Sequence, residues 1–385
     1  MNKTLHDVAG RYPVVTVTGP RQAGKSTLCR MAFPHTPYVT LEDPVARAQA
    51  VEDPIAFLRQ FPDGAVLDEG QRAPELFSFI QGLVDERAKP GQFILTGSQH
   101  LGLTAAISQS LAGRTALLNL LPLSFDEIGR FPESSHDLYE TLFTGGYPRI
   151  HDQHLPVAEW LANYVGTYLE RDVRQIINIG DMLTLQRFLG VCAGRSAQLA
   201  NLSGLASDVG VAENTAKSWL SVLEATFITF RMAPLYRNIN KRLVKTPKIY
   251  FNDTGLLCFL LGIRSPEQIA QHPLRGAIFE TWCVSELRKR RLNQGLTPDM
   301  YFYRDHKGEE LDLVIEDGTS LELIEIKSGQ TIAADFFATI EALAPIFARQ
   351  PGIADVKKTM IYGGTTAPSR GGTRVIGWAS LGSYG

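Results

Sequence analysis

A glycine-rich segment near the N-terminus has the composition of a phosphate-binding loop. Residues 19–27 match the pattern GxxxxGK[ST] and follow an apolar stretch that predicts a buried strand. Glycines let backbone N–H groups turn toward phosphate oxygens, and the helix expected from Leu28 directs the positive end of its dipole at them. Lys25 is expected to reach the β- and γ-phosphates, and the Ser26 hydroxyl to coordinate magnesium. The predicted nucleotide-binding residues are Gly19, Pro20, Arg21, Gln22, Ala23, Gly24, Lys25, Ser26 and Thr27.

Two adjacent carboxylates end a second apolar stretch. Residues 64–69 read Gly-Ala-Val-Leu-Asp-Glu, the form expected of a Walker B segment. Asp68 would hold the magnesium ion through water, and Glu69 would polarise the water that attacks the γ-phosphate. The alternative is a strand that ends in an exposed acidic turn, but the phosphate-binding loop favours the catalytic interpretation. ATP and Mg2+ are therefore the expected cofactors, with Lys25 and Glu69 as catalytic residues.

Further strands and helices are expected to place these groups at one edge of a sheet. A third strand over residues 92–96 ends in polar residues, of which Thr96 or Ser98 is the candidate sensor of the γ-phosphate. Alternation of strands and helices indicates a largely parallel sheet covered on both faces, with ATP at the carboxyl ends of its strands. The other predicted elements are a strand at 115–121 and helices at 44–50, 74–88 and from Ser124.

Residues 202–224 have the spacing of a helix-turn-helix, with a tight turn at Gly210. Residues 227–232 alternate like a strand that would begin a wing, and residues 157–189 have helical spacing. The alternative is a winged-helix unit used only for packing or oligomerisation. If DNA binds here, the exposed groups of the second helix are Asn214, Thr215, Lys217 and Ser218.

Basic residues cluster in two stretches. No acidic residue occurs between Glu224 and Asp253, and residues 288–291 are all basic. Either stretch is compatible with a phosphate backbone, and equally with a solvated or salt-bridged surface. The first contains the candidate DNA contacts Lys241, Arg242 and Lys245, together with Arg231, Arg237 and Lys248.

A hairpin in the last third brings carboxylates together. Residues 311–316 and 320–327 predict two strands, and Asp317-Gly318 is a hairpin signal. A two-residue loop there makes Glu325 the diagonal neighbour of Asp312, whereas a four-residue loop makes the two directly opposed. Either register places both carboxylates and Lys327 on one face.

These groups, with Glu280 from an upstream helix, resemble the PD-(D/E)xK nuclease superfamily. That resemblance implies carboxylates that hold a second Mg2+ or Mn2+ and a lysine that orients water against a phosphodiester. The alternative is a fold retained for DNA binding or for packing. The nuclease-like set is Glu280, Asp312, Glu325 and Lys327.

Most of the chain resembles the AAA-type P-loop ATPases that carry a C-terminal domain of unknown function 4143. The resemblance implies an ATP-driven machine, commonly a ring in which an arginine of one subunit completes the neighbour's site. Candidates for that arginine are Arg114, Arg149 and Arg171. Gly70 departs from the family pattern, which commonly has an apolar residue there. The matching segments are residues 19–27, 67–71, 95–98, 110–114, 122–127, 145–148, 168–173 and 247–255.

The bulk composition sets the class of protein. The chain has 385 residues, 44% hydrophobic residues and a net charge of -2, which is typical of two or three globular domains. It has no apolar run near the roughly 18 residues of a membrane span, and its N-terminus lacks a secretory pattern. A cytoplasmic protein without a membrane contact is expected. The widely spaced cysteines suggest neither a zinc site nor disulfides: Cys29, Cys192, Cys258 and Cys283.

Together these patterns predict an α/β protein with three domains. They are an AAA-like P-loop domain over 1–152, a helical and winged-helix domain over 153–265, and a small α/β nuclease-like domain over 266–385. The preferred function is an ATP-hydrolysing motor that remodels or translocates DNA, including branched DNA such as Holliday junctions, as a homo-oligomeric ring, for example a hexamer. The alternatives are a nucleotide-controlled signalling or defence switch that acts on a protein partner, and an ATP-controlled DNA nuclease.

Overall fold

The chain folds into two compact units in a computed structural model. Unit 1 comprises residues 1–122, 225–227 and 289–297, and unit 2 comprises residues 123–224, 228–288 and 298–385. The structure describes residues 1–87, 89–98, 110–132, 135, 137–168, 182–235, 245–306, 308–365 and 371–384.

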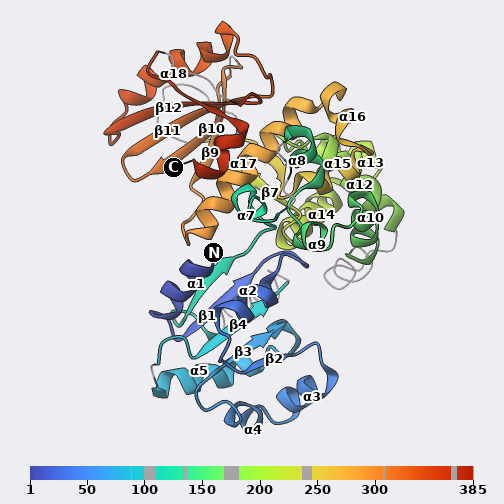
Figure 1. Cartoon of the computed structure of the whole chain (residues 1–385), viewed down its shortest axis with the longest axis vertical. Helices are drawn as coiled ribbons and strands as arrows, with labels where there is room; N and C mark the ends of the chain where they lie inside the picture. The colour runs from blue at the N-terminus through green and yellow to red at the C-terminus, as the bar shows by residue number, and fades with distance from the viewer. Residues whose placement is uncertain are drawn as a thin grey trace. The chain divides into compact units, whose positions relative to one another are not determined.

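Unit 1 is built on a five-stranded parallel sheet with the order β2-β3-β4-β1-β5 (Figure 1). One strand, β4, therefore separates the strand before the phosphate-binding loop from the strand that ends in Asp68. This arrangement confirms the predicted P-loop fold class. The strands are β1 (Val14–Thr18), β2 (Tyr38–Thr40), β3 (Ala65–Asp68), β4 (Phe93–Gly97) and β5 (Thr115–Asn119).

Helices cover both faces of this sheet because its strands bury alternate residues on opposite sides. Val15, Val66 and Ile94 pack with residues of α1 (Asn2–Ala9) and α2 (Lys25–Ala32). Val14, Leu67 and Leu95 pack with helices on the other face. Those helices are α3 (Pro44–Glu52), α4 (Pro54–Arg59) and α5 (Leu76–Arg87).

The first part of unit 2 contains the helix-turn-helix. α13 (Leu202–Val209) ends at Gly210, whose φ of 81° allows the sharp turn into α14 (Glu213–Ala225). A small antiparallel sheet with the order β6-β8-β7 accompanies it, formed by β6 (Gln198–Leu199), β7 (Thr229–Met232) and β8 (Lys248–Phe251). The other helices are α7 (Phe125–Ile128), α8 (Leu138–Thr144), α9 (Pro148–Gln153), α10 (Val157–Tyr168), α12 (Met182–Gly194), α15 (Thr254–Leu260) and α16 (Pro266–Gln271).

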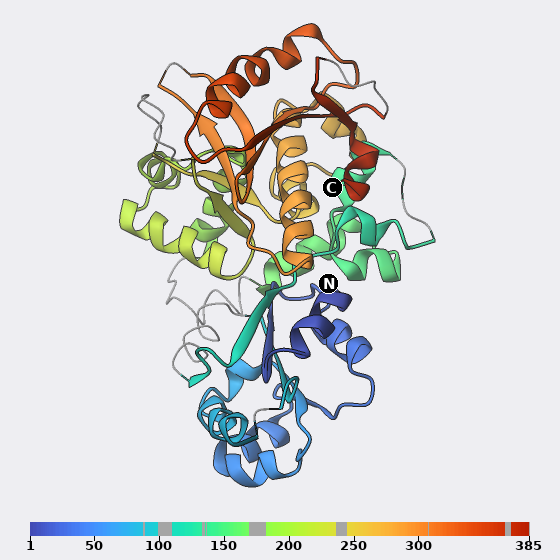
Figure 2. The same ribbon diagram turned by 90° about the vertical axis from the view of Figure 1, so that its left-hand side faces the viewer.

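The second part of unit 2 is a mixed five-stranded sheet with the order β13-β12-β11-β10-β9. β9, β10 and β11 are antiparallel, whereas β11, β12 and β13 are parallel. Leu323 on β11 packs with residues of α18, and its neighbour Ile324 belongs to the cluster that includes Phe279 of α17. The two helices therefore lie on opposite faces of this sheet, as the ribbon in Figure 2 shows. The elements are α17 (Arg275–Asn293), β9 (Met300–Arg304), β10 (Glu310–Asp317), β11 (Ser320–Lys327), α18 (Ala338–Ala348), β12 (Asp355–Tyr362) and β13 (Arg374–Gly377).

The sequence assigned no element after Gln330, so α18, β12 and β13 are additions from the structure. Pro345 lies inside α18, which weakens its helical signal. Within the described residues, no helix combines the length and the apolar character needed to span a membrane.

Candidate functional site

The loop between β1 and α2 is shaped by close backbone packing. A Cβ added at Gly19 would lie 1.9 Å from the carbonyl oxygen of Leu120, so only glycine fits at the start of the loop. Gln22 and Gly24 have φ values of 60° and 92°, which curl the chain before α2 begins at Lys25. The N-cap residue of α2 is Gly24, which has no side chain to cap the first amide groups. Those amides therefore face the loop, as an anion site requires.

Lys25 is held inside this loop. Its side chain is buried, and its Nζ donates hydrogen bonds to the carbonyl oxygens of Gly19 at 3.0 Å and Pro20 at 2.8 Å. The ammonium group thus lies on the inner side of the loop, against the backbone of its first two residues. A phosphate that enters this interior would meet a positive charge that is already in position.

The carboxylate of Asp68 is the centre of a hydrogen-bond network. Ser26 Oγ donates to its two oxygens at 3.0 and 3.1 Å, and the Tyr38 hydroxyl donates to Oδ2 at 2.6 Å. Thr96 on β4 donates to Oδ1. Burial and the hydrogen bond to Asp68 raise the pKa of Tyr38 to about 12, so its hydroxyl stays a donor at neutral pH.

Glu69 follows Asp68 with its backbone in the left-handed region, at a φ of 57°. Ser98 Oγ donates to its Oε2 at 3.2 Å, and Gln71 Nε2 donates to the same oxygen. Its backbone N–H donates to Thr96 Oγ1 at 3.3 Å. The two candidate sensors, Thr96 and Ser98, therefore contact the Walker B carboxylates, and their role toward the γ-phosphate stays a prediction.

Sequence models of three domain families match consecutive parts of the chain: an AAA domain over residues 11–129, a domain of unknown function (DUF8612) over 135–267, and another (DUF4143) over 275–381. Two relatives, uncharacterized protein Rv2008c of Mycobacterium tuberculosis and uncharacterized protein Mb2031c of Mycobacterium bovis, are each 34% identical over 321 residues. That match covers 82% of this chain and 69% of each relative. The chain belongs to the family of AAA-domain P-loop ATPases with a C-terminal DUF4143 domain.

This membership confirms the resemblance expected from the motifs. A solved structure, the Walker-type ATPase PABY2304 of Pyrococcus abyssi, is also similar, with a TM-score of 0.43 and 15% identity. The similarity covers 67% of this chain and 94% of that one. The division into three domains at the predicted boundaries stays a prediction.

The residues of the loop fit a nucleotide with Mg2+. Hydroxyl and carboxylate oxygens are the ligands that Mg2+ prefers, and Ser26 and Asp68 supply one of each in direct contact. Because their oxygens already lie 3.0 Å apart, both can approach one ion, directly or through water. The predicted nucleotide-binding and metal residues therefore come together in unit 1.

In the hairpin of unit 2, formed by β10 and β11, the strand register places the carboxylates of Asp312 and Glu325 directly opposite each other. Asp317 pairs with Ser320, so the two-residue loop is Gly318-Thr319 and not the Asp317-Gly318 turn that the sequence suggested. The pairing of Leu313 with Ile324, continued by one residue, places Asp312 opposite Glu325. Asp312 Oδ2 accepts from the backbone N–H of Ile326 at 2.8 Å.

The nuclease-like residues lie together as one charge cluster. Lys327 Nζ lies 2.5 Å from Glu325 Oε1. Burial and the charge of Asp312 raise the pKa of Glu325 to about 8 and that of Glu280 to about 7, so the carboxylates are close enough to disfavour one another's ionisation. The prediction that Glu280, Asp312, Glu325 and Lys327 converge agrees with this geometry.

The same cluster does not fit a metal ion well. Glu280 Oε1 already lies 3.0 Å from the ammonium of Lys248 and accepts a hydrogen bond from the Tyr250 hydroxyl at 2.7 Å. Glu310 Oε1 lies 2.5 Å from the same ammonium. In the described part of the chain no group of three or more His, Cys, Asp or Glu side chains is placed to hold a metal. A second Mg2+ or Mn2+ here is therefore not supported by the donor set.

The helix-turn-helix presents the predicted polar groups to solvent. On α14, Asn214, Lys217 and Ser218 are exposed and Thr215 is partly exposed, while Ala216 is buried. Lys245 is exposed, and the candidates Lys241 and Arg242 lie outside the described residues. This placement is compatible with a groove-facing helix.

Several cations of the two basic stretches are engaged within the chain. Arg231 forms two hydrogen bonds of 2.6 Å with the carboxylate of Glu224. Lys248 is buried in the charge cluster, and Lys289 is buried as well. Arg288 donates to Asn252 Oδ1 at 2.8 Å and stacks 4.5 Å from the ring centroid of Phe230. Among the residues that the structure describes, these four cations therefore have contacts or burial within the chain.

The candidate trans-acting arginines have local partners or lie outside the described residues. Arg114 contacts the Asp85 carboxylate through Nε at 2.5 Å and NH2 at 2.8 Å, which lowers the pKa of Asp85. Arg149 Nε donates to Gln153 Oε1 at 3.1 Å, and both side chains are on the surface. Arg171 is not among the described residues. Exposed pairs of this kind are weak and exchange readily with a partner.

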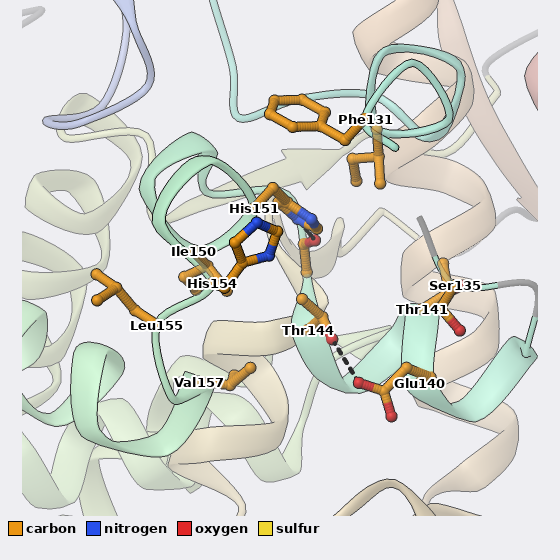
Figure 3. Close-up of a pocket in the computed structure, with 12 residues that line it drawn as sticks. Phe131, Ser135, Glu140, Thr141, Thr144, Ile150, His151, His154, Leu155 and Val157 are labelled. Carbon is orange, nitrogen blue, oxygen red and sulfur yellow. Dashed lines mark hydrogen bonds between the residues drawn. The ribbon is translucent and has the colours of Figure 1, made fainter. Parts of the chain in front are cut away.

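A separate cavity of about 230 Å³ lies in unit 2 among α7, α8 and α9 (Figure 3). Figure 3 draws His151 and His154 among the side chains that line it. His151 Nε2 is 2.8 Å from the carbonyl oxygen of Gly145, and Thr144 donates to Glu140 at 3.2 Å. The predicted site residues do not line this cavity.

Some residues contact the site carboxylates although no such role followed from the sequence. Tyr38 and Gln71 hold the Walker B carboxylates, and no local pattern marks either of them. Lys248 and Tyr250 hold Glu280, and here a signal existed. A lysine inside the apolar strand Lys-Ile-Tyr-Phe needs a buried partner of opposite charge, because an unpaired buried ammonium is costly.

The raised pKa of Glu325 predicts a pH-dependent stability. The folded state keeps the proton up to about pH 8, whereas the unfolded chain releases it near the ordinary value of 4.5. The free energy of unfolding should therefore fall as pH rises between these values, because the folded state binds more protons in that window. The charged groups that face Glu325 are Lys327 on β11, Asp312 on β10 and Glu280 on α17.

Chemical denaturation at several pH values measures this slope. Glu325→Gln should reduce it, because the amide is neutral at every pH. Asp317→Asn, at the exposed end of the same hairpin, should leave it unchanged. An identical pH profile for wild type and Glu325→Gln would contradict the assignment.

Proposed function

We propose that the chain hydrolyses ATP at the loop of unit 1. The observation that carries this proposal is the convergence of Lys25 in the loop with Ser26, whose hydroxyl contacts Asp68. Lys25 would hold the β- and γ-phosphates, and Ser26 with Asp68 would hold the magnesium ion, which neutralises phosphate charge when bound. Glu69, next in the chain, would orient and polarise the attacking water.

Tyr38 and Thr96 act in this proposal as positioning residues. If Ser26 gave its oxygen to the ion, its hydrogen bonds to Asp68 would be lost. The hydroxyls of Tyr38 and Thr96 then keep the carboxylate in place, one on each oxygen. Gln71 and Ser98 hold the Glu69 carboxylate in the same way.

Two substitutions test the ATPase assignment. Lys25→Ala should abolish ATP binding, because the loop loses its buried cation. Glu69→Gln should keep ATP binding but lower turnover by roughly 100-fold or more, because the amide cannot accept a proton. Nucleotide binding and phosphate release measure the two effects separately.

Glu86→Gln, at an exposed position of α5, is the matched control and should behave as wild type. Turnover that survives in Lys25→Ala would exclude this loop as the ATPase site.

We further propose that α14 contacts DNA and that ATP turnover remodels or translocates it, branched DNA included. The support is the exposure of Asn214, Lys217 and Ser218 on the second helix of a helix-turn-helix. The competing function is a nucleotide switch that acts on a protein partner. It predicts slow turnover that no DNA changes.

ATP hydrolysis with linear, forked and four-way DNA separates these functions. We expect DNA to stimulate turnover, and Lys217→Ala to weaken DNA binding and reduce its salt dependence, because one phosphate contact is lost. Lys357→Ala, exposed on β12, should have no such effect. Turnover and binding indifferent to every DNA form at low salt would favour the protein-partner switch.

Finally, we propose a cytoplasmic homo-oligomeric ring in which Arg114 completes a neighbouring site. Arg114→Ala should then lower turnover without loss of ATP binding, because a transition-state charge loses its partner. Asp85→Asn is the matched control, since it breaks the observed ion pair but keeps the arginine. A 42.5 kDa monomer in light scattering with ATP would contradict the ring.

A further inference from the structure

A lysine from β8 lies inside the carboxylate cluster of unit 2. Lys248 is 2% exposed, and its Nζ lies 3.0 Å from Glu280 Oε1 on α17 and 2.5 Å from Glu310 Oε1 on β10. The ammonium group therefore joins three elements that are far apart in the sequence. One carboxylate oxygen of Glu280 and one of Glu310 contact this single ammonium group.

The surrounding contacts keep this ammonium charged and in place. Tyr250, two residues along the same strand, donates to the Glu280 oxygen that Lys248 contacts, at 2.7 Å. The ring centroid of Phe302 lies 5.5 Å from Nζ. Burial by itself would lower the pKa of Lys248, but the charges of Glu280, Asp312 and Glu310 raise it instead. The lysine is therefore a permanent cation at neutral pH.

We propose that the Lys248 ammonium is the resident cation of this cluster and takes the place that a divalent metal would have beside Glu280. A metal ion bound by Glu280 would have to share Oε1 with Lys248 and Tyr250, which already contact it, or bind through Oε2 alone. The ion would also face a fixed positive charge in a buried setting, where repulsion between cations is strong. The cluster then stabilises the packing of β8 against α17 and β10 through ion pairs. It does not catalyse metal-assisted cleavage of DNA.

The remaining residues of the cluster, Asp312, Glu325 and Lys327, are also compatible with Lys248 as the resident cation. Lys327 pairs with Glu325 Oε1 at 2.5 Å, and Asp312 Oδ2 is used by the backbone N–H of Ile326. Glu325 Oε2 is buried without a hydrogen-bond partner among the described residues. Burial and the charge of Asp312 raise the pKa of Glu325 to about 8, so this carboxyl gives up its proton less readily than a free glutamic acid, whereas a metal ligand has to be deprotonated.

Mn2+ titration without nucleotide tests the proposal, so its outcome does not depend on ATP hydrolysis. Wild type should show no rise in melting temperature with Mn2+ that depends on Glu280. Lys248→Met should melt at a lower temperature, and Mn2+ should raise that temperature, because the ion replaces the lost ammonium. The rise should disappear in the double variant Lys248→Met with Asp312→Asn, which also separates this cluster from Asp68 in unit 1.

Lys327→Met is the matched control, because it removes a lysine from the other half of the cluster. It should lower stability without a comparable gain of Mn2+ binding at Glu280. If Lys248→Met does not fold, calorimetry of Mn2+ with wild type still decides. Mn2+ binding by wild type that Glu280→Gln and Asp312→Asn each remove, or plasmid cleavage with the same dependence, would overturn the proposal.

Discussion

The nucleotide site depends on how the carboxylate of Asp68 is held. Its partners come from α2, β2 and β4, and each contributes a hydroxyl. Parallel strands end at a common edge, so Thr96 near the end of β4 lies beside Asp68 at the end of β3. Tyr38 is the first residue of β2 and reaches the carboxylate with its long side chain. The hydroxyls orient the carboxylate without adding a positive charge of their own. That is the electrostatic condition under which a buried acid favours a divalent cation.

Unit 2 uses the same residue types with the opposite electrostatic result. Its carboxylates are also brought together by sheet geometry, through the hairpin register and the packing of α17. Here, however, Lys248 and Lys327 contact the acids directly and supply the positive charge from within the chain. A buried ion pair is hard to remove once formed, because each partner would be left without compensation. The cluster thus links β8 and β10 to α17.

The number of basic residues in a stretch of the sequence overstates how many of them form a basic surface. Arg231 and Lys248 come from one acid-free stretch, yet each has a carboxylate partner from a distant part of the chain. Arg288 is stacked on an aromatic ring. Among the described residues, Lys245 is exposed, and α14 has an exposed side on which the helical period separates polar residues from buried ones.

The sequence by itself determined the elements whose signals are local. The phosphate-binding loop, the strand that ends in Asp68, the turn at Gly210 and the hairpin followed from spacing, glycine placement and alternation within a few residues. The tertiary structure decided the partners: Tyr38 on Asp68, Gln71 on Glu69 and Lys248 on Glu280. It also placed the hairpin turn at Gly318-Thr319, one residue later than Asp317-Gly318. The strands β12 and β13 were visible only in the structure. The physical reason is that hydrogen bonds and ion pairs form between atoms that packing brings together, and a residue's own neighbours in the chain do not encode which distant charge it will meet.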